Sequence, residues 1–317
     1  MNVSKIAGLL AGCAIPFIAG AAQAQALTSA DLLRAADGRL PQFLACLKEH
    51  RTSVIGAHRG GPLPEHPENA IVTMTRTGNL VPVFMETDVQ QSSDGVLFQN
   101  HDDVLDRNTT GKGKIADQTW AQISKLKQRD TTAAPTIYAP PLLSEVLDWA
   151  KDRSLLLLDV KPNTDPALVI GEVEKAKADG RVMYLAYTIE EAQGFRKLRP
   201  DAIVALPMFD RANLEAAKAA GLMDHRLLAM VRPAAADAAF IRDVEQSGAL
   251  IMSGTYGGPK TPDAVYVTTK DAQAFQAMTK PGARFLVSNR PVEAAQALMA
   301  DPAYVAKLKT CGVVAKR

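Results

Sequence analysis

The sequence lacks a marked excess of charge of either sign. It has 36 Lys and Arg residues against 34 Asp and Glu residues, which gives a formal net charge of +2. A protein whose main partner is nucleic acid or an anionic membrane usually carries a strong basic excess or a basic segment. We therefore expect no nucleic-acid partner, and we expect any basic group that matters for function to belong to a local site.

Long apolar runs are also lacking beyond the N-terminus, so we expect no stable membrane span in the folded protein. Residues 1–26 have the features of a secretory signal: Lys5, an apolar stretch over 6–22, and small residues at Ala22, Ala24 and Ala26. The alternative is a transmembrane anchor, for which this stretch is marginal in length. The sequence thus predicts a cleaved signal followed by a domain over 27–317 in the periplasm or outside the cell.

Cysteine is scarce, with three residues in the whole chain. Cys13 ends a Leu-Ala-Gly-Cys segment that resembles a lipoprotein cleavage box, but apolar residues follow it where a lipoprotein usually has a polar tether. If the signal is removed, Cys46 and Cys311 remain near opposite ends of the mature chain. In an oxidising compartment this pair is a candidate disulfide, and two separate buried thiols are the alternative.

No low-complexity linker and no short repeat interrupt residues 50–311, where short apolar runs alternate with segments of helical period. Apolar strands separated by helices are typical of a parallel sheet covered on both faces, and eight of them match a (β/α)₈ TIM barrel. A doubly wound sheet is the alternative. The expected strands are Val54–His58, Val83–Asp88, Leu155–Lys161, Val182–Tyr187, Ile203–Leu206, Leu227–Val231, Leu250–Ser253 and Phe285–Ser288.

Three further features add to the barrel pattern. The alternating run Val96–Asn100 follows Asp94-Gly95, which predicts a β-hairpin arm after the second strand. Asn163 or Asp165, followed by Pro166, is typical of a helix start, with a capping residue before a proline in the first turn. Residues 29–49 predict an additional amphipathic helix before the barrel that closes its bottom.

Ionisable residues end four consecutive elements of this pattern. In a parallel barrel the carboxyl ends of the strands meet at one face, which is where active sites lie. We therefore expect these side chains to form one cluster. They are His58 with Arg59, Glu86 with Asp88, His101 with Asp102, and Asp159 with Lys161.

The carboxylates in this cluster predict a metal site. Glu86 and Asp88 are two residues apart on a strand, so both side chains point to the same face. A divalent cation would relieve their repulsion, and Asp159 on the next strand can complete the site. Oxygen ligands of this kind favour Ca²⁺ or Mg²⁺. The alternative is a set of strand-end salt bridges, for example between Lys161 and Glu86.

His58 and His101 are the natural proton-transfer pair, because imidazole titrates near neutral pH. Hydrolysis of a phosphodiester needs a base to activate the nucleophile and an acid to protonate the leaving alkoxide. Cationic side chains then offset charge on the phosphoryl oxygens, a role that suits Arg59 and Lys161.

The sequence resembles the glycerophosphodiester phosphodiesterase family at these residues. Each segment alone is weakly specific, but the ordered set is highly specific, and the strong match covers about residues 54–162. The segments are His58-Arg59-Gly60, Pro67-Glu68-Asn69, Glu86-Thr87-Asp88, Asp94-Gly95, His101-Asp102, Leu105–Gly113, Pro141–Leu147 and, later, Val287–Pro291.

The resemblance implies a TIM barrel with a Ca²⁺ or Mg²⁺ site at Glu86, Asp88 and Asp159, and a glycerophosphodiester as the small-molecule substrate. It also implies His58 as base and His101 as acid, with the products an alcohol and sn-glycerol 3-phosphate. A hydroxyl of the substrate's own glycerol attacks first in that mechanism, and water then opens the cyclic phosphate.

The sequence departs from the family pattern at two places. Asp159 stands where the family usually has glutamate, and the region before the last strand has Ser253–Gly258, with Tyr256, in place of a frequent tryptophan. A phospholipase-like enzyme that cleaves intact lipids and a non-catalytic periplasmic phosphodiester-binding protein remain the alternatives. The sequence does not indicate the alcohol group or the oligomeric state.

Overall fold

The computed structural model describes residues 26–232 and 237–315. The signal expected over 1–26 therefore lies outside the described residues, apart from its last position. Within the described segments, no helix combines the length and the hydrophobicity needed to cross a bilayer.

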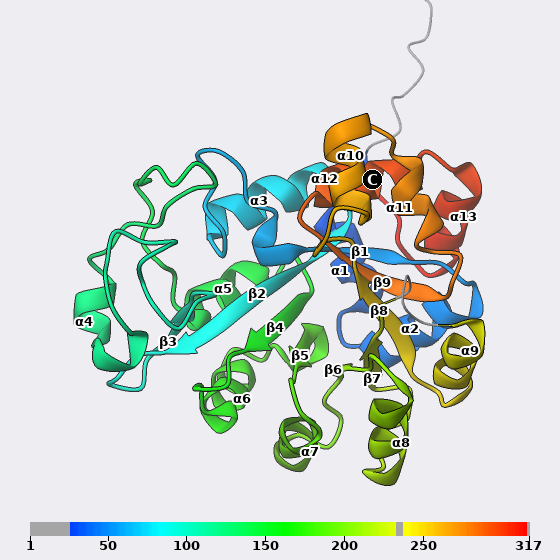
Figure 1. Ribbon diagram of the computed structural model, residues 1–317, viewed down its shortest axis with the longest axis horizontal. Coiled ribbons are helices and arrows are strands. Elements are labelled where there is room, and N and C mark those ends of the chain that lie inside the picture. The colour runs from blue at the N-terminus through cyan, green and yellow to red at the C-terminus, as the bar shows by residue number, and fades with distance from the viewer. Residues whose placement is uncertain (1–25, 233–236, 316–317) are drawn as a thin grey trace, which may run out of the picture.

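Eight parallel strands close into a barrel, and the order β1-β9-β8-β7-β6-β5-β4-β2 is completed by the pairing of β1 with β2 (Figure 1). The TIM-barrel prediction is confirmed, and each expected strand is present with small differences at its ends. The ninth described strand, β3, pairs antiparallel with the end of β2, as expected of a hairpin arm. The strands are β1 (Val54–Ala57), β2 (Val83–Gln91), β3 (Leu97–Gln99), β4 (Leu156–Val160), β5 (Val182–Leu185), β6 (Val204–Pro207), β7 (Leu227–Met230), β8 (Leu250–Gly254) and β9 (Ala283–Ser288).

Helices surround the barrel and pack against its outward-facing side chains. The predicted helix start is confirmed, and Asp165 is the one of its two candidate caps that is used: its carboxylate accepts a hydrogen bond from the Ala167 N–H at 2.8 Å. The helices are α1 (Ser29–Ala36), α2 (Leu40–Glu49), α3 (Ile71–Leu80), α4 (Trp120–Ile123), α5 (Leu143–Ala150), α6 (Pro166–Lys175), α7 (Ile189–Leu198), α8 (Arg211–Ala219), α9 (Ala238–Gln246), α10 (Pro262–Thr269), α11 (Gln273–Ala277), α12 (Pro291–Met299) and α13 (Pro302–Thr310), with 3₁₀ turns η1 (His58–Gly60), η2 (Ile115–Asp117) and η3 (Asp179–Arg181).

The inward-facing side chains change character along the barrel axis. Near the start of the strands they are apolar, for example Phe84, Leu157 and Phe285, and they form one buried cluster. Gly56 makes room for this packing, since a Cβ there would lie 2.3 Å from Cζ of Phe84. Two and four residues beyond Phe84 on the same face, β2 carries Glu86 and Asp88, so the barrel is polar only toward the carboxyl ends of its strands.

The segment before the barrel forms two helices, so the prediction of a single helix over 29–49 is wrong. The chain turns between α1 and α2 at Gly38, whose φ of +70° favours glycine. The Gly38 N–H also donates to the carbonyl of Gly180 at 3.3 Å, which fixes the turn against η3. The expected position is confirmed: Leu32, Leu44 and other apolar residues of both helices pack on the barrel interior and close its bottom.

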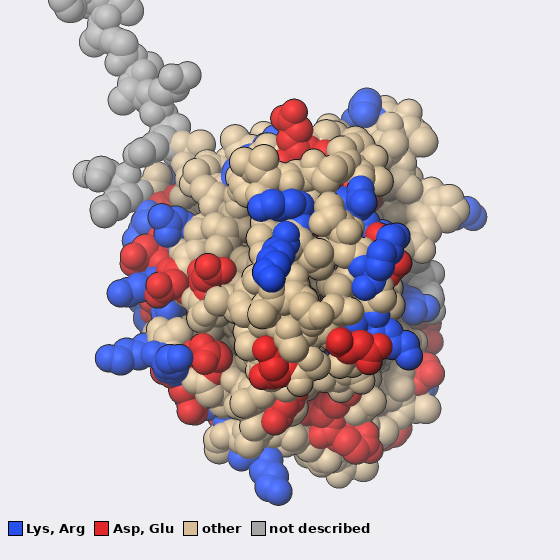
Figure 2. All heavy atoms as spheres, turned by 90° about the vertical axis from the view of Figure 1, so that its left-hand side faces the viewer, with Lys and Arg blue, Asp and Glu red and all other residues tan. Residues whose placement is uncertain are grey.

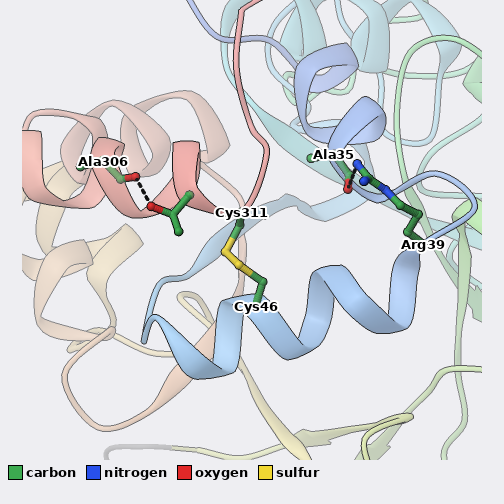
Figure 3. Close-up of a disulfide and its surroundings, with 6 residues drawn as sticks. Ala35, Arg39, Cys46, Ala306 and Cys311 are labelled. Atoms are coloured by element: carbon green, nitrogen blue, oxygen red, sulfur yellow. Dashed lines mark hydrogen bonds between the residues drawn. A yellow bond between two sulfur atoms is a disulfide. The ribbon is translucent and has the colours of Figure 1, made fainter.

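A disulfide joins this bottom layer to the end of the described chain. Cys46 lies in α2, and Cys311 immediately follows α13 (Figure 3). The two sulfurs are bonded, with 5.7 Å between the Cα atoms and a sequence separation of 265. The two ends of the folded domain are thus covalently fastened to each other at the closed end of the barrel.

An insertion between β3 and α5 extends from the open end of the barrel and includes η2 and α4. It has a small core of its own, formed by Phe98, Leu105, Ile115 and Ile123, with Trp120 packed against it. On the face of the molecule that carries this insertion, basic and acidic side chains lie side by side (Figure 2). This agrees with the near-balanced charge of the sequence.

Candidate active site at the carboxyl ends of the strands

The turn after β1 places His58 and Arg59 at the open end of the barrel. Arg59 has a left-handed backbone, with a φ of +52°, and the two glycines after it also have positive φ. This conformation directs the Arg59 N–H to Glu86 Oε2 at 2.7 Å. A non-glycine residue in this region is strained, and such strain often marks a functional site.

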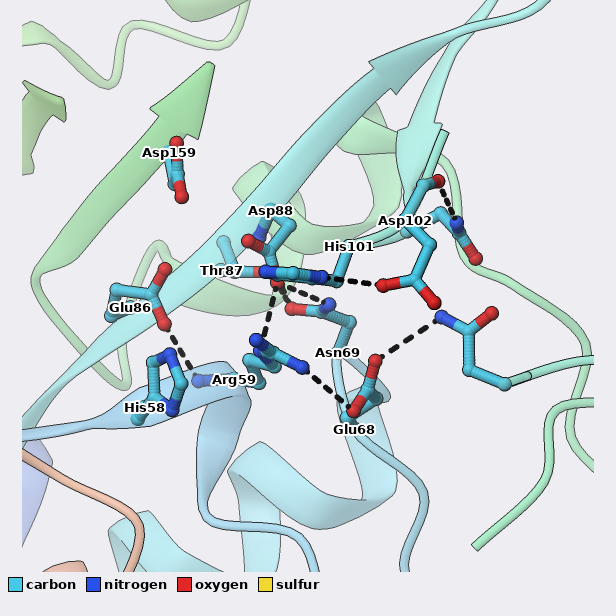
Figure 4. A network of polar contacts seen from close by, with 12 residues as sticks. His58, Arg59, Glu68, Asn69, Glu86, Thr87, Asp88, His101, Asp102 and Asp159 are labelled. Carbon is cyan, nitrogen blue, oxygen red and sulfur yellow. Dashed lines mark hydrogen bonds and ion pairs between the residues drawn. The ribbon is translucent and has the colours of Figure 1, made fainter. Parts of the chain in front are cut away.

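The three expected metal ligands come together. One carboxylate oxygen each from Glu86, Asp88 and Asp159 lies within 4.8 Å of the others, and all three residues are buried. The three side chains come from the paired strands β2 and β4 (Figure 4), where Asp88 is the register partner of Asp159. Burial, together with the charges of Asp88 and Asp159, raises the pKa of Glu86 well above its ordinary value. The ionised form of Glu86 is therefore disfavoured unless a further positive charge is present.

Lys161 neutralises part of this charge. Its Nζ lies 2.6 Å from Asp88 Oδ1 and 2.7 Å from Asp159 Oδ2. Burial alone would lower the pKa of Lys161. The two carboxylates outweigh burial and raise this pKa, so the side chain stays charged. The structure thus has strand-end ion pairs, but Lys161 pairs with the two aspartates and not with Glu86. Among the described residues, Glu86 forms no ion pair.

His58 is held in one orientation from two sides. Its Nδ1 lies 2.6 Å from Asn289 Oδ1, and its ring stacks on Tyr256 with 4.2 Å between the ring centres. An amide oxygen only accepts hydrogen bonds, so Nδ1 carries the proton and Nε2 keeps a free lone pair. Burial and the neighbouring Arg59 lower the pKa of His58 to about 4, which leaves the ring neutral at pH 7.

His101 is oriented by Asp102, whose Oδ1 lies 2.6 Å from Nδ1 of the ring. This contact leaves Nε2 on the side of the ring that faces Asp88 (Figure 4). Burial alone would raise the pKa of Asp102. Hydrogen bonds from Arg107 and His101 outweigh burial and lower this pKa to about 2. The two histidines therefore approach the carboxylates from two different elements, η1 and the turn after β3.

An alternating chain of acids and bases connects His101 to the other side of the site. Arg107 binds Asp102 through Nε at 2.7 Å and binds both carboxylate oxygens of Glu68, at 2.7 and 3.0 Å. Glu68 in turn accepts from Arg59 Nη1 at 3.1 Å. Arg59 Nε lies 3.6 Å from Asp88 Oδ2. Bidentate arginine–carboxylate pairs are geometrically specific, so this chain fixes Arg59 relative to the carboxylates.

Asn69 supports the strand that carries two of the carboxylates. Its Nδ2 donates to Asp88 Oδ2 at 2.7 Å, and its Oδ1 accepts from the backbone N–H of Asp88 at 3.1 Å. Thr87 Oγ1 donates to the same amide oxygen at 3.0 Å. These contacts leave the Asp88 carboxylate a single orientation toward Glu86 and Asp159.

All seven predicted site residues lie in this one cluster. The sequence reasoning gave no role to the residues that orient them, although most stand in the motifs that carried the resemblance. Tyr187 stands in none of these motifs, and its hydroxyl donates to Asp159 Oδ1 at 2.6 Å. The clue to Tyr187 was its position at the end of an expected strand, facing the same side as the rest of the cluster. The orienting residues are Glu68, Asn69, Asp102, Arg107, Tyr187, Tyr256 and Asn289.

The fold and the site define a class of protein: a TIM barrel with a buried carboxylate cluster between two histidines at its open end. A family model described as the glycerophosphoryl diester phosphodiesterase family matches residues 58–256. The chain belongs to this family.

Individual relatives agree with this assignment. A Bacillus subtilis glycerophosphodiester phosphodiesterase is 31% identical over 166 residues, which cover 46% of this chain and 56% of the relative. The matched segments span about a third to a half of the curated relatives that are most similar. Among solved structures, a glycerophosphoryl diester phosphodiesterase from Parabacteroides distasonis has a TM-score of 0.72 at 23% identity, over 87% of this chain and 94% of its own. A phosphodiesterase from Oleispira antarctica, solved in complex with the product sn-glycerol-3-phosphate, has a TM-score of 0.65 at 18% identity, over 78% and 97%.

Proposed function

We propose that this protein hydrolyses glycerophosphodiesters to an alcohol and sn-glycerol 3-phosphate. The observation that carries the proposal is the pair of oriented histidines, His58 and His101, on either side of the buried carboxylates. A protein that only binds phosphodiesters has no need of two such histidines. Family membership supports the same reaction, as does the product held by the Oleispira antarctica relative of this fold.

The carboxylate cluster fits a divalent cation, and we propose Ca²⁺ or Mg²⁺ held by Glu86, Asp88 and Asp159. The three buried carboxylates lie within 4.8 Å of one another, and the ion pairs from Lys161 and Arg59 go to Asp88 and Asp159 and leave Glu86, among the described residues, without one. All-oxygen ligand sets favour hard cations over zinc. Such a cation supplies positive charge beside the phosphoryl oxygens when it is bound.

His58 and His101 carry out the proton transfers. His58 is neutral at pH 7 and its Nε2 has a free lone pair, which suits a base that removes a proton from the attacking hydroxyl. The attacking group is a hydroxyl of the substrate's own glycerol, and water opens the resulting cyclic phosphate. His101 donates a proton to the leaving alkoxide, and Asp102 keeps its ring in position.

Arg59 and Lys161 complete the environment of the phosphate. Both side chains are held close to the carboxylates. Arg59 donates a hydrogen bond to Glu68, and Lys161 Nζ lies 3.2 Å from the hydroxyl of Tyr187. Fixed cations beside the reacting phosphorus stabilise the charge that develops on its oxygens without reorganising during the reaction.

We also propose that the domain over 27–317 acts in the periplasm or outside the cell after removal of the signal over 1–26. The disulfide between Cys46 and Cys311 supports this location, because disulfides form and persist in oxidising compartments.

The decisive experiment measures release of sn-glycerol 3-phosphate from three glycerophosphodiesters whose alcohols are cationic, neutral and anionic. We expect release that stops in a chelator and returns with Ca²⁺ or Mg²⁺, and no return in Glu86→Gln or Asp88→Asn. Binding without release from any of the three would identify the non-catalytic alternative. Faster release of phosphorylated head groups from intact phospholipid vesicles would identify the phospholipase alternative.

A further inference from the structure

The described residues include many aromatic side chains, but only two of them are exposed, and both lie at the open end of the barrel. They are Tyr187, which is 39% exposed, and Phe209, which is 42% exposed. The remaining described Phe, Tyr and Trp residues are buried or half-buried. Exposed aromatic side chains that gather beside an active site are typical of a surface that contacts a ligand.

The alternation of the strands shows that these residues face the mouth of the barrel. Met208 and Val231 are buried in the outer core between barrel and helices. The backbone ladder continues one residue beyond β6 and β7, because the Met208 N–H donates to the Met230 carbonyl at 2.9 Å and the Val231 N–H to the Met252 carbonyl at 2.8 Å. The next residues in the chain, Phe209 and Arg232, are exposed and follow the same alternation to the other face. The register agrees, because Pro207 pairs with Met230 and both residues stand two positions before this pair.

Arg232 lies over the ring of Phe209, with 4.2 Å between its guanidinium carbon and the ring centre. In the described part of the chain it has no carboxylate within ion-pair distance. The residues that follow it, Pro-Ala-Ala-Ala at 233–236, contain no acid. The rim formed by Tyr187, Phe209 and Arg232, called here the aromatic rim, thus carries a positive charge that the described residues leave unpaired.

The aromatic rim is poorly suited to a quaternary ammonium group. Such a group is usually held against open aromatic faces. Here each exposed ring already has a cation of the protein beside it: Arg232 on Phe209, and Lys161 Nζ at 5.9 Å from the ring centre of Tyr187. Lys161 is already paired with Asp88 and Asp159, so a cationic head group would meet the unpaired charge of Arg232, whereas an anionic head group would complete an ion pair with it.

The leaving oxygen of the alcohol part must lie at His101, which protonates it, and the aromatic rim is on a side of the mouth that is open to the rest of the alcohol part. The glycerol part has to bring a hydroxyl to His58, and this side of the mouth is bounded by Tyr256 and Asn289. On the side of His101, Asp102, Arg107 and Glu68 are already paired with one another. The ends of β5, β6 and β7 are the remaining side.

We propose that the aromatic rim binds the alcohol part of the glycerophosphodiester and that Arg232 makes the enzyme favour anionic over cationic head groups. The inference rests on the proposed hydrolysis, since it names the part of that substrate that the rim contacts. Arg232 then determines which head groups are preferred, while the residues at the ends of β1, β2 and β4 carry out proton transfer and bind the phosphate.

The test compares kcat/KM for glycerophosphocholine, glycerophosphoglycerol and glycerophosphoinositol 4-phosphate in the metal-loaded enzyme. We expect the anionic diester to be preferred over the choline diester by about two- to fivefold, the size of effect expected for one partly exposed charge pair. The preference should shrink at high ionic strength. Arg232→Gln should remove it, and Arg232→Lys should keep most of it.

Lys280→Gln is the matched control, because it removes one exposed charge from the loop before β9, at the opposite end of the barrel. An unchanged preference in Arg232→Gln, an equal loss for all three diesters, or the same change in Lys280→Gln would overturn the inference. A choline diester hydrolysed as fast as the anionic one would also overturn it, while leaving the proposed function intact. No release from any of the three would overturn the proposed function, and the inference with it.

Discussion

The two ends of the barrel use the same strands for opposite purposes. On β2, Phe84 packs in the apolar lower half, while Glu86 and Asp88 stand in the polar upper half. On β4, Leu157 precedes Asp159 and Lys161 in the same way. The lower end is closed by α1, α2 and a disulfide, whereas the upper end gathers buried charges. A barrel whose lower end is packed and covalently fastened can therefore hold, at its upper end, a site that is costly to bury.

The cost at the upper end is electrostatic. Burial and two neighbouring carboxylates raise the pKa of Glu86, which means that its ionised form is disfavoured there. The lower end supplies the opposing contribution through buried apolar area at roughly 25 cal/mol per Å². Substitutions at the upper end should therefore change activity more than stability, and substitutions at the lower end should do the reverse.

The largest effect should come from the two histidines at the upper end. His58→Ala and His101→Ala should each lower kcat by about 10²–10⁴-fold, the usual contribution of general acid–base catalysis. The thermal midpoint should stay close to that of the wild type. His225→Ala, an exposed histidine before β7 at the lower end, is the control and should keep full activity. Near-normal turnover in both variants would reduce the cluster to a binding site or an ion-pair network.

A better leaving group should separate the roles of the two histidines. A nitrophenyl diester needs little help from an acid, so it should partly restore His101→Ala and leave His58→Ala inactive. The measurement is the ratio of rates on the nitrophenyl ester and the natural diester for each variant. The reverse pattern would exchange the assignments of base and acid.

At the lower end, loss of the disulfide should affect stability and leave catalysis unchanged. Replacing Cys46 and Cys311 together with serine should lower the free energy of unfolding by about 2–5 kcal/mol, because the bond closes a very long loop. Chemical denaturation measures the change, and kcat per folded molecule should equal that of the wild type. A fall in kcat without a loss of stability would contradict the division between the two ends.

A smaller change in stability, of opposite sign, is expected for Glu86→Gln without metal. Removing one of three buried carboxylates should raise the free energy of unfolding by about 1 kcal/mol, since like charges in the interior repel each other. Ca²⁺ or Mg²⁺ should stabilise the wild type in thermal unfolding and should no longer stabilise the variant. Glu190→Gln, an exposed glutamate on α7, is the control and should behave like the wild type. A less stable variant would show that the carboxylates are already balanced.

The smallest effect concerns pH. A base must be neutral to accept a proton, and His58 has a pKa of about 4, below its ordinary value. Activity should therefore persist as pH falls through 6.5 and should decline only toward pH 4. The profile of kcat/KM at saturating metal measures this limb. A decline centred near pH 6.5 would mean that the working base has an ordinary imidazole pKa.

The sequence predicted the barrel and the seven residues of the cluster because both depend on local pattern. Strand ends can be found from apolar runs, and residues two apart on a strand share a face. The partners across the chain could not be derived in this way. Asn289, just after the last strand, reaches His58 because barrel closure pairs β9 with β1. Tyr187, just after β5, contacts Asp159 of the neighbouring β4, and the pattern indicated its face but not this contact. The break at Gly38 was missed because a single glycine inside an amphipathic pattern is compatible with one helix or two.

The bond between Cys46 and Cys311 also ties assembly to the order of synthesis. Cys46 precedes every strand of the described barrel, and Cys311 follows all of them. A nascent chain therefore cannot form this bond until the last strand and α13 have emerged. A fragment that stops earlier keeps a free thiol on α2 and an unsealed barrel. A thiol-reactive probe can therefore distinguish molecules in which Cys46 is bonded to Cys311 from truncated ones in which Cys46 is free.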